Sequence, residues 1–213
     1  MTNTVFFSCD EDYYNDWGIN LIRSIQHYNP WMNIHAHVVN PKKLVEMKQV
    51  IYTTETKKFY SESERISYLQ CSRFLAVPKY YPTTELVMAI DADTICTQSS
   101  DPDYFKQTAE HVSVLKHHKN NNWLAGLVTF GENDFRHVFA KKILETNIWE
   151  PGHDQKVLRS LSEIYDYKEP TVSVPWMKQG ISGYKGIFFT LKGEQKIAQK
   201  YRVLYNEQLR KIK

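Results

Sequence analysis

The segment that decides the fold is an apolar run ending in two aspartates, Glu85-Leu-Val-Met-Ala-Ile-Asp91-Ala-Asp93-Thr94. Its length and its lack of apolar–polar alternation predict a central strand over residues 85–90, covered on both faces. Residues two apart in extended backbone point to the same side, so Asp91 and Asp93 should present both carboxylates where this strand ends. Ligands of open α/β sheets bind at that end. Paired carboxylates suit a hard divalent cation such as Mg²⁺ or Mn²⁺.

Strands and helices alternate on both sides of this segment. Apolar, β-branched and aromatic runs predict further strands over residues 4–9, 33–39, 49–52, 112–115, 123–130, 171–174 and 187–191. Apolar residues at helical spacing predict helices over residues 16–28, 64–77, 134–145, 155–165 and 193–213, and a helical turn over 42–48. Asp16 is expected to cap the first helix, and Pro78 and Pro82 to end the second. The alternation predicts an α/β fold with a mixed, mostly parallel sheet and helices on both faces.

The composition is that of an ordinary globular domain and excludes several classes of protein. The net charge of +3 is too small to indicate a nucleic-acid partner. The three cysteines, Cys9, Cys71 and Cys96, lack metal-ligand spacing, which predicts free thiols in a reducing compartment. No stretch approaches the roughly 20 apolar residues that a membrane span needs. We therefore expect a soluble, cytoplasmic protein with one domain over residues 1–213, cut from a longer chain because its last helix lacks a C-cap.

Two enzyme classes use an apolar strand that runs into paired aspartates. In haloacid-dehalogenase-type phosphatases, Asp91 would be the nucleophile of an Asp-x-Asp-x-Thr motif. Here Thr94 falls one residue early, 90 residues precede Asp91, and no obvious acidic pair follows. In a glycosyltransferase, the two carboxylates would hold a cation that stabilises charge on the departing diphosphate. We favour the transferase and retain two alternatives, the phosphatase and a domain that binds a nucleotide sugar without turnover.

Other motifs surround this strand. Before it lie the acidic loop Ser8-Cys9-Asp10 with Tyr13-Tyr14, and the helical segment Tyr68-Leu-Gln-Cys-Ser-Arg73-Phe74. After it lie Trp123-Leu-Ala125-Gly126, Gly152-His-Asp154-Gln155 and Gly180-Ile-Ser182-Gly183-Tyr-Lys185. Over residues 3–190 this order of scattered motifs resembles the GT-A fold glycosyltransferases, most of all the family-8-type retaining enzymes. The resemblance implies a Rossmann-like fold for nucleotide-diphospho-sugars, a UDP-sugar donor, Mn²⁺ or Mg²⁺, and hexose transfer with retention to a glycan or glycoprotein.

The resemblance also implies roles for residues on the nucleotide side of the site. Ser8, Cys9 and Asp10 would lie at the nucleoside. A tyrosine would stack on the uracil, with Tyr14 favoured by helix spacing and Tyr13 as the alternative. Arg73 would contact the diphosphate or lock the acidic motif. The remaining donor-site residues would be Ala92 beside the donor, Asp93 as the main metal ligand, and Asp91 as the second ligand or a ribose contact.

On the sugar side, the resemblance implies that Ala125 and Gly126 lie close to the sugar ring. Asp154 would bind sugar hydroxyls and Gln155 would lie beneath the anomeric carbon, although Asp154 is also a good N-cap for the helix after it. Gly183 and Lys185 would grip the diphosphate. Ser182 replaces the family's histidine, which leaves the third metal ligand open. The short chain also resembles the first domain of a large viral capsid glycosyltransferase, which implies a viral capsid glycan as acceptor and the host cytoplasm as location.

Overall fold

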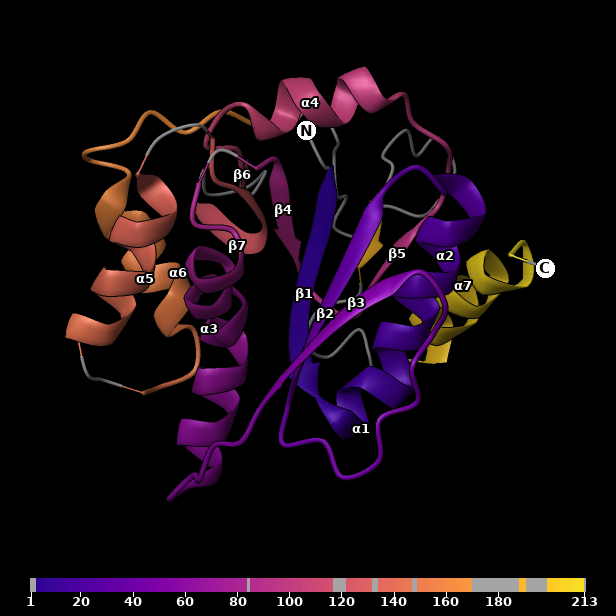
Figure 1. Ribbon diagram of the computed structural model, residues 1–213, viewed down its shortest axis with the longest axis horizontal. Helices are drawn as coiled ribbons and strands as arrows, with labels where there is room; N and C mark the ends of the chain where they lie inside the picture. Colours follow the sequence, from indigo (N-terminus) through magenta and orange to yellow (C-terminus); the bar gives the residue numbers. More distant parts are fainter. Residues whose placement is uncertain are drawn as a thin grey trace.

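A computed structural model describes residues 3–83, 85–116, 122–131, 134–146, 149–169, 188–190 and 199–212. A six-stranded sheet of order β3-β2-β1-β4-β7-β6 runs through the middle of the molecule (Figure 1). Its strands are β1 (Thr4–Asp10), β2 (Asn33–Val39), β3 (Val50–Glu55), β4 (Val87–Ile90), β6 (Val114–Lys116) and β7 (Trp123–Thr129). The first four strands are parallel, and β7 is antiparallel to both β4 and β6. The expected mixed, mostly parallel α/β sheet is confirmed.

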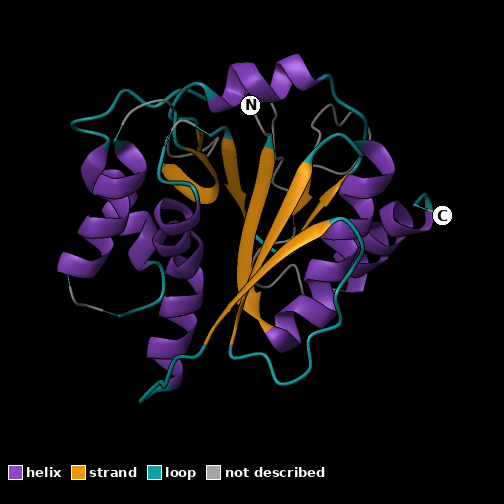
Figure 2. Cartoon of the chain, in the orientation of Figure 1, coloured by secondary structure: helices purple, strands orange, loops and turns teal. Residues whose placement is uncertain are grey.

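Helices cover both faces of this sheet (Figure 2). One face carries α1 (Glu11–Tyr13), the π-helical turn η1 (Tyr14–Gly18) and α2 (Ile19–Tyr28), and the other carries α3 (Glu62–Tyr80), α5 (Phe135–Glu145) and α6 (His153–Leu161). The side-chain alternation of β1 explains the two layers, because successive residues of a strand point to opposite faces. Phe7 packs in the cluster that contains Leu21 and Ile22 of α2, whereas Phe6 packs in the cluster that contains Phe74 of α3.

Shorter elements complete the described chain. They are β5 (Thr94–Cys96), α4 (Pro102–Ala109), β8 (Phe188–Thr190) and α7 (Gln199–Arg210). β5 pairs antiparallel with β8 in a separate two-stranded sheet. Within the described ranges, no helix is both long enough and apolar enough to cross a membrane. The predicted strand over 171–174 lies outside the described residues.

The first helical segment begins earlier than Asp16, so that expected N-cap is wrong. The side chain of Asp10 accepts a hydrogen bond from the Tyr13 amide at 2.9 Å, and α1 starts at Glu11. A carboxylate placed there satisfies an otherwise unpaired amide of the first turn and favours the helix dipole. Asp10, the last residue of β1, is therefore also the N-cap of α1.

The helical turn expected over residues 42–48 is absent. The backbone amides of Lys42 and Lys43 donate to the Glu11 carboxylate, and the amide of Met47 donates to the Tyr52 hydroxyl at 2.7 Å. Side-chain oxygens thus accept hydrogen bonds from backbone amides that, in a helix, would donate to backbone carbonyls.

The end predicted for α3 at Val77 is also wrong, because the helix continues through Pro78 to Tyr80 and ends before Pro82. Proline removes only its own amide, and the next turn still closes through a hydrogen bond of 2.8 Å from the Tyr81 amide to the Val77 carbonyl. The carbonyls of Tyr81 and Pro82 then accept hydrogen bonds from Arg136 and His137 of α5. Side chains of α5 thus satisfy carbonyls just beyond the end of α3.

Candidate active site

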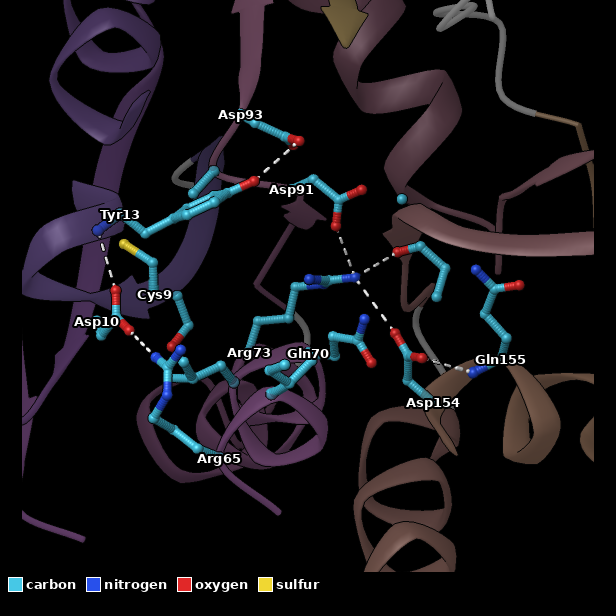
Figure 3. Close-up of a pocket in the computed structure, with 16 residues that line it drawn as sticks. Cys9, Asp10, Tyr13, Arg65, Gln70, Arg73, Asp91, Asp93, Asp154 and Gln155 are labelled. Carbon is cyan, nitrogen blue, oxygen red and sulfur yellow. Dashed lines mark hydrogen bonds and ion pairs between the residues drawn. The ribbon is translucent and has the colours of Figure 1, made fainter. Parts of the chain in front are cut away.

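A cavity of about 470 Å³ opens where β1 and β4 end (Figure 3). It lies between the turn after β4, the helix α3 and the start of α6. Of the residues expected at a site from the sequence, those that line it are Ser8, Cys9, Asp10, Tyr13, Arg73, Asp91, Ala92, Asp93, Ala125, Gly126, Asp154 and Gln155. The rule that ligands bind at strand ends therefore located the cavity correctly in this sheet.

Asp91 and Asp93 lie on a tight turn that is fixed at both ends. The Asp91 amide donates to the Gly126 carbonyl and the Thr94 amide donates to the Asp91 carbonyl, each at 3.1 Å. Beyond the turn, the Cys96 amide donates to the Ser24 hydroxyl at 2.8 Å and so anchors β5 to α2. The Asp93 residue is only 4% exposed, whereas the Asp91 side chain is 23% exposed.

Tyr13 contacts the Asp93 carboxylate directly. Its hydroxyl donates to Oδ2 of Asp93 at 3.0 Å. Burial, and then the negative charge of Asp93, raise the pKa of Tyr13 well above its ordinary value. The tyrosine is therefore a permanent hydrogen-bond donor near neutral pH. It orients Asp93 while its ring forms part of the cavity wall.

Arg73 is the buried cation at the centre of the site. Its Nη2 lies 2.9 Å from Oδ1 of Asp91 and 3.5 Å from Oδ2 of Asp154, and it donates to the Ala125 carbonyl at 2.9 Å. Burying a charge is costly unless it is paired, and two carboxylates pair this one at Nη2. The buried Nε of Arg73 has no hydrogen-bond partner within the described residues. In this geometry Arg73 pairs directly with Asp91 of the acidic motif.

Gly126 faces Asp91 from the neighbouring strand β7. A Cβ atom built at this glycine would lie 3.0 Å from Oδ2 of Asp91, closer than side chains normally approach. The absence of a side chain therefore leaves Asp91 room to keep its carboxylate between β7 and Arg73. Ala125, next to it, contributes its carbonyl to Arg73.

Asp154 does not cap α6, so the N-cap alternative for this residue is wrong. Gly152, with φ of +83°, holds the cap position, and Asp154 lies in the first turn. Its Oδ1 accepts from the Gln155 amide at 2.8 Å while its Oδ2 faces Arg73. The Gly152 amide donates to Gln70 of α3 at 2.8 Å, which ties the start of α6 to α3. Asp154 and Gln155 thereby reach the cavity wall.

The end of β1 supplies the opposite wall. The Ser8 hydroxyl lies 2.7 Å from that of Ser72, which joins β1 to α3. Burial raises the pKa of the Cys9 thiol well above its ordinary value, so the thiol stays neutral. The Asp10 carboxylate pairs with Arg65 on one oxygen and accepts from the Tyr13 amide on the other.

Tyr14 does not line the cavity, contrary to the preference drawn from helix spacing. Its side chain is fully buried, and its hydroxyl lies 2.7 Å from the Tyr52 hydroxyl and donates to the Val45 carbonyl at 2.8 Å. The π-helical turn η1 interrupts regular α-helical spacing between this loop and α2. As a result Tyr13, rather than Tyr14, faces the cavity.

Four cavity residues were missed from the sequence, namely Arg65, Ile66, Leu69 and Gln70 of α3. Their spacing could have revealed them, because residues 65, 69 and 73 follow one another at intervals of four along one side of a helix. Ser182, Gly183 and Lys185 lie outside the described residues. Within the part of the chain that the structure describes, no group of three or more His, Cys, Asp or Glu side chains is arranged to hold a metal ion.

No protein-family model matches this sequence, and no curated protein is significantly similar to it. Solved structures do match, and they identify the fold as that of GT-A glycosyltransferases. One is the apo form of the glycosyltransferase GlyE from Streptococcus pneumoniae TIGR4, with a TM-score of 0.65 and 12% identity over 98% of this chain. Another is the galactosyltransferase LgtC in complex with donor and acceptor sugar analogues, with the same TM-score, identity and coverage of this chain. The chain spans 60% of the length of GlyE and 94% of that of LgtC.

Proposed function

We propose that the chain is a metal-dependent glycosyltransferase that moves a hexose from a UDP-sugar to a glycan or glycoprotein acceptor. The observation that carries the proposal is the Asp91–Asp93 turn at the end of β4, which opens on a 470 Å³ cavity and is locked by Arg73. A GT-A fold supports it. So does LgtC, a galactosyltransferase of the same fold that was crystallised with donor and acceptor sugar analogues.

The carboxylates fit a divalent cation in their chemistry and in their setting. Asp91 and Asp93 offer hard oxygen ligands, and Gly126 leaves space beside Oδ2 of Asp91. Mg²⁺ and similar ions keep several water or phosphate ligands, so two protein carboxylates are an adequate set. A cation held there would offset the negative charge that develops on the diphosphate as the sugar leaves.

The remaining residues would each contact a different part of the donor. Tyr13, which lines the cavity, is the residue we propose for stacking on the uracil in place of Tyr14. Ser8, Cys9, Asp10 and Ala92 would surround the nucleoside, and Gly183 with Lys185 would contact the phosphates. Arg73 holds Asp91 and Asp154 in place, so that the latter can bind sugar hydroxyls.

We further propose that the anomeric configuration is retained. Gln155 would lie beneath the anomeric carbon, and Asp154 shares its charge with Arg73, which makes it a weak nucleophile. Front-side attack, in which an oxygen of the departing phosphate takes the acceptor proton, fits this arrangement. The anomeric configuration of the product, read by nuclear magnetic resonance, tests retention.

Calorimetry with UDP and Mn²⁺ tests the core of the proposal. Asp93→Asn should weaken UDP binding at least about tenfold, because a charged metal ligand is lost. Asp166→Asn is the matched control, since this aspartate is exposed and lies outside the cavity. Equal UDP binding by Asp93→Asn, or binding that needs no metal, would contradict the proposal.

Two activity assays separate the alternatives. Phosphate release from an aryl phosphate, lost in Asp91→Asn, would support the phosphatase instead. Donor hydrolysis above background would exclude a domain that only binds the nucleotide sugar. The acceptor panel should include a viral capsid glycan, and the free, buried thiols of Cys9, Cys71 and Cys96 support the cytoplasmic location proposed for this domain of residues 1–213.

A further inference from the structure

Arg65 lies between two hollows of the site and was not anticipated from the sequence. It projects from the first turns of α3 and lines both the 470 Å³ cavity and a second hollow of similar volume, which is also lined by Asp10, Tyr13 and Asn40. Its guanidinium group bridges two carboxylates. Nε and Nη2 donate to the two oxygens of Glu62 at 2.8 and 2.6 Å, and Nη1 pairs with Asp10.

The contacts of Arg65 continue to the Asp-x-Asp turn (Figure 3). Oδ2 of Asp10 forms an ion pair with the guanidinium group of Arg65, while Oδ1 accepts a hydrogen bond from the Tyr13 amide at 2.9 Å. The hydroxyl of the same tyrosine donates to Asp93 at 3.0 Å. Glu62, Arg65, Asp10, Tyr13 and Asp93 therefore form one continuous chain of contacts from the surface of α3 to the proposed metal ligand.

The charges around the second hollow explain why Asp10 needs a cation. Acidic side chains outnumber basic ones on its wall, where Asp10, Glu11, Asp12 and Asp16 stand against Lys42 and Arg65. Like charges push a carboxylate out of place unless a cation offsets them. The planar fork of arginine fixes the direction of a bound carboxylate as well as its charge. The Arg65 side chain is 36% exposed, so the contact adds little stability, and its main effect is on orientation.

We propose that Arg65 is a positioning residue that sets donor affinity and base preference by holding the Asp10 carboxylate. This inference rests on the proposed function. A carboxylate has about four acceptor positions, so Asp10 can accept a further N–H from a ligand besides those of Tyr13 and Arg65. Uracil offers an N–H at N3, whereas cytosine offers a lone pair there. A fixed Asp10 therefore favours UDP over CDP.

Calorimetry with UDP and Mn²⁺ on Arg65→Ala, Asp10→Asn and the double variant tests this inference. Each single variant should bind UDP about tenfold more weakly, since each loses a charge-assisted contact. The double variant should bind no more weakly than Asp10→Asn, because Arg65 acts through Asp10. Arg65→Lys should recover part of the affinity, and the preference for UDP over CDP should fall in Arg65→Ala.

Arg159→Ala, at an exposed arginine of α6 outside both hollows, is the matched control and should bind UDP normally. Circular dichroism shows whether each variant is folded. Unchanged UDP affinity in Arg65→Ala would overturn the inference, as would a further loss in the double variant, which would indicate direct contact with the donor. A wild-type chain that fails to bind UDP would overturn the proposed function and this inference together, and is distinguishable from both results.

Discussion

At the position of Gly126, the Asp91 carboxylate leaves little room for a side chain. The Asp91 carboxylate has Arg73 on one oxygen at 2.9 Å and the glycine beside the other. Substitution by even the smallest side chain would therefore act on the geometry of Asp91. This is a constraint of space, because Gly126 does not have a positive φ.

We expect Gly126→Ala to weaken Mn²⁺-dependent UDP binding by about tenfold, through displacement of a single charged ligand. Calorimetry with UDP at saturating Mn²⁺ measures the effect. Gly152→Ala is the matched control: nothing lies within 4 Å of its added Cβ, but its φ of +83° is strained for alanine. It should lower the free energy of unfolding by about 1 kcal/mol and leave UDP affinity near wild type. Normal UDP binding by Gly126→Ala would contradict the prediction that a side chain at this position displaces Asp91.

The choice between the adjacent residues Tyr13 and Tyr14 could not be made correctly from the residues alone, because Tyr13 lines the cavity and Tyr14 does not. Regular α-helical spacing from this loop into α2 would place Tyr14 at the uracil. The π-helical turn between Tyr14 and Gly18 breaks that spacing, and no residue pattern announces such a turn. Arg73, by contrast, could be anticipated from its motif, although its contact with the Ala125 carbonyl depends on how β7 docks.

Among the elements, strand β2, which lies between β3 and β1, carries a buried histidine pair. His35 on β2 contacts the hydroxyls of Tyr81 and Thr53, both at 2.8 Å, and His37 contacts Thr53 at 2.9 Å. Glu55 lies 3.6 Å from His37 on its other side. Burial first, and the neighbouring His37 second, lower the pKa of His35 to about 4. His35 is therefore neutral in the folded protein at ordinary pH.

This shift predicts loss of stability in mild acid. A histidine of the unfolded chain takes a proton near pH 6.5, whereas folded His35 resists it to about pH 4. His35 therefore imposes no penalty above pH 6.5, and stability falls as the pH drops from 6.5 toward 4, by at most about 1.4 kcal/mol per pH unit. Urea unfolding at several pH values measures this slope.

Because carboxylates titrate in the same window, the variant His35→Gln isolates the histidine. It should show a shallower slope than wild type between pH 6.5 and 4, whereas His27→Gln, at an exposed histidine, should not. Parallel slopes for wild type and His35→Gln would mean that His35 protonates freely in the folded state.

The elements that could be predicted are those that a continuous apolar run of the local sequence is enough to specify. The runs at residues 4–9 and 33–39 correspond to β1 and β2 almost residue for residue, because buried parallel strands need continuous apolar sequence. β5 and α4 were not anticipated. β5 has only three residues, and its partner β8 lies far along the chain. Helix α4 carried a local signal that was overlooked, an Asp101 cap followed by Pro102.

For the whole molecule, the proposed function predicts that UDP and Mn²⁺ together raise the thermal unfolding midpoint. A ligand at a hundred times its dissociation constant stabilises the native state by about 2.7 kcal/mol. In a protein of this size, that corresponds to an increase of several degrees, about 5–10 °C. Differential scanning fluorimetry should show the increase, and a chelator should abolish it. An increase that survives chelation would exclude a metal role in donor binding.

At this scale the fold was more predictable than the site. The shape is shared with LgtC at 12% identity, so the pattern of buried positions specifies it rather than particular residues. Site residues at strand ends followed from the topology of the sheet. Arg65, Ile66, Leu69 and Gln70 did not, because the side of α3 that faces the cavity is set by its docking on the sheet and on α6.

Arg73 joins three parts of the chain that are distant in sequence: Asp91 after β4, Ala125 on β7 and Asp154 on α6. One guanidinium group thus makes these positions interdependent, so that loss of one carboxylate changes the surroundings of the other. Over evolution this couples the histories of the two aspartates. We therefore expect that related chains change positions 73, 91 and 154 together rather than one at a time.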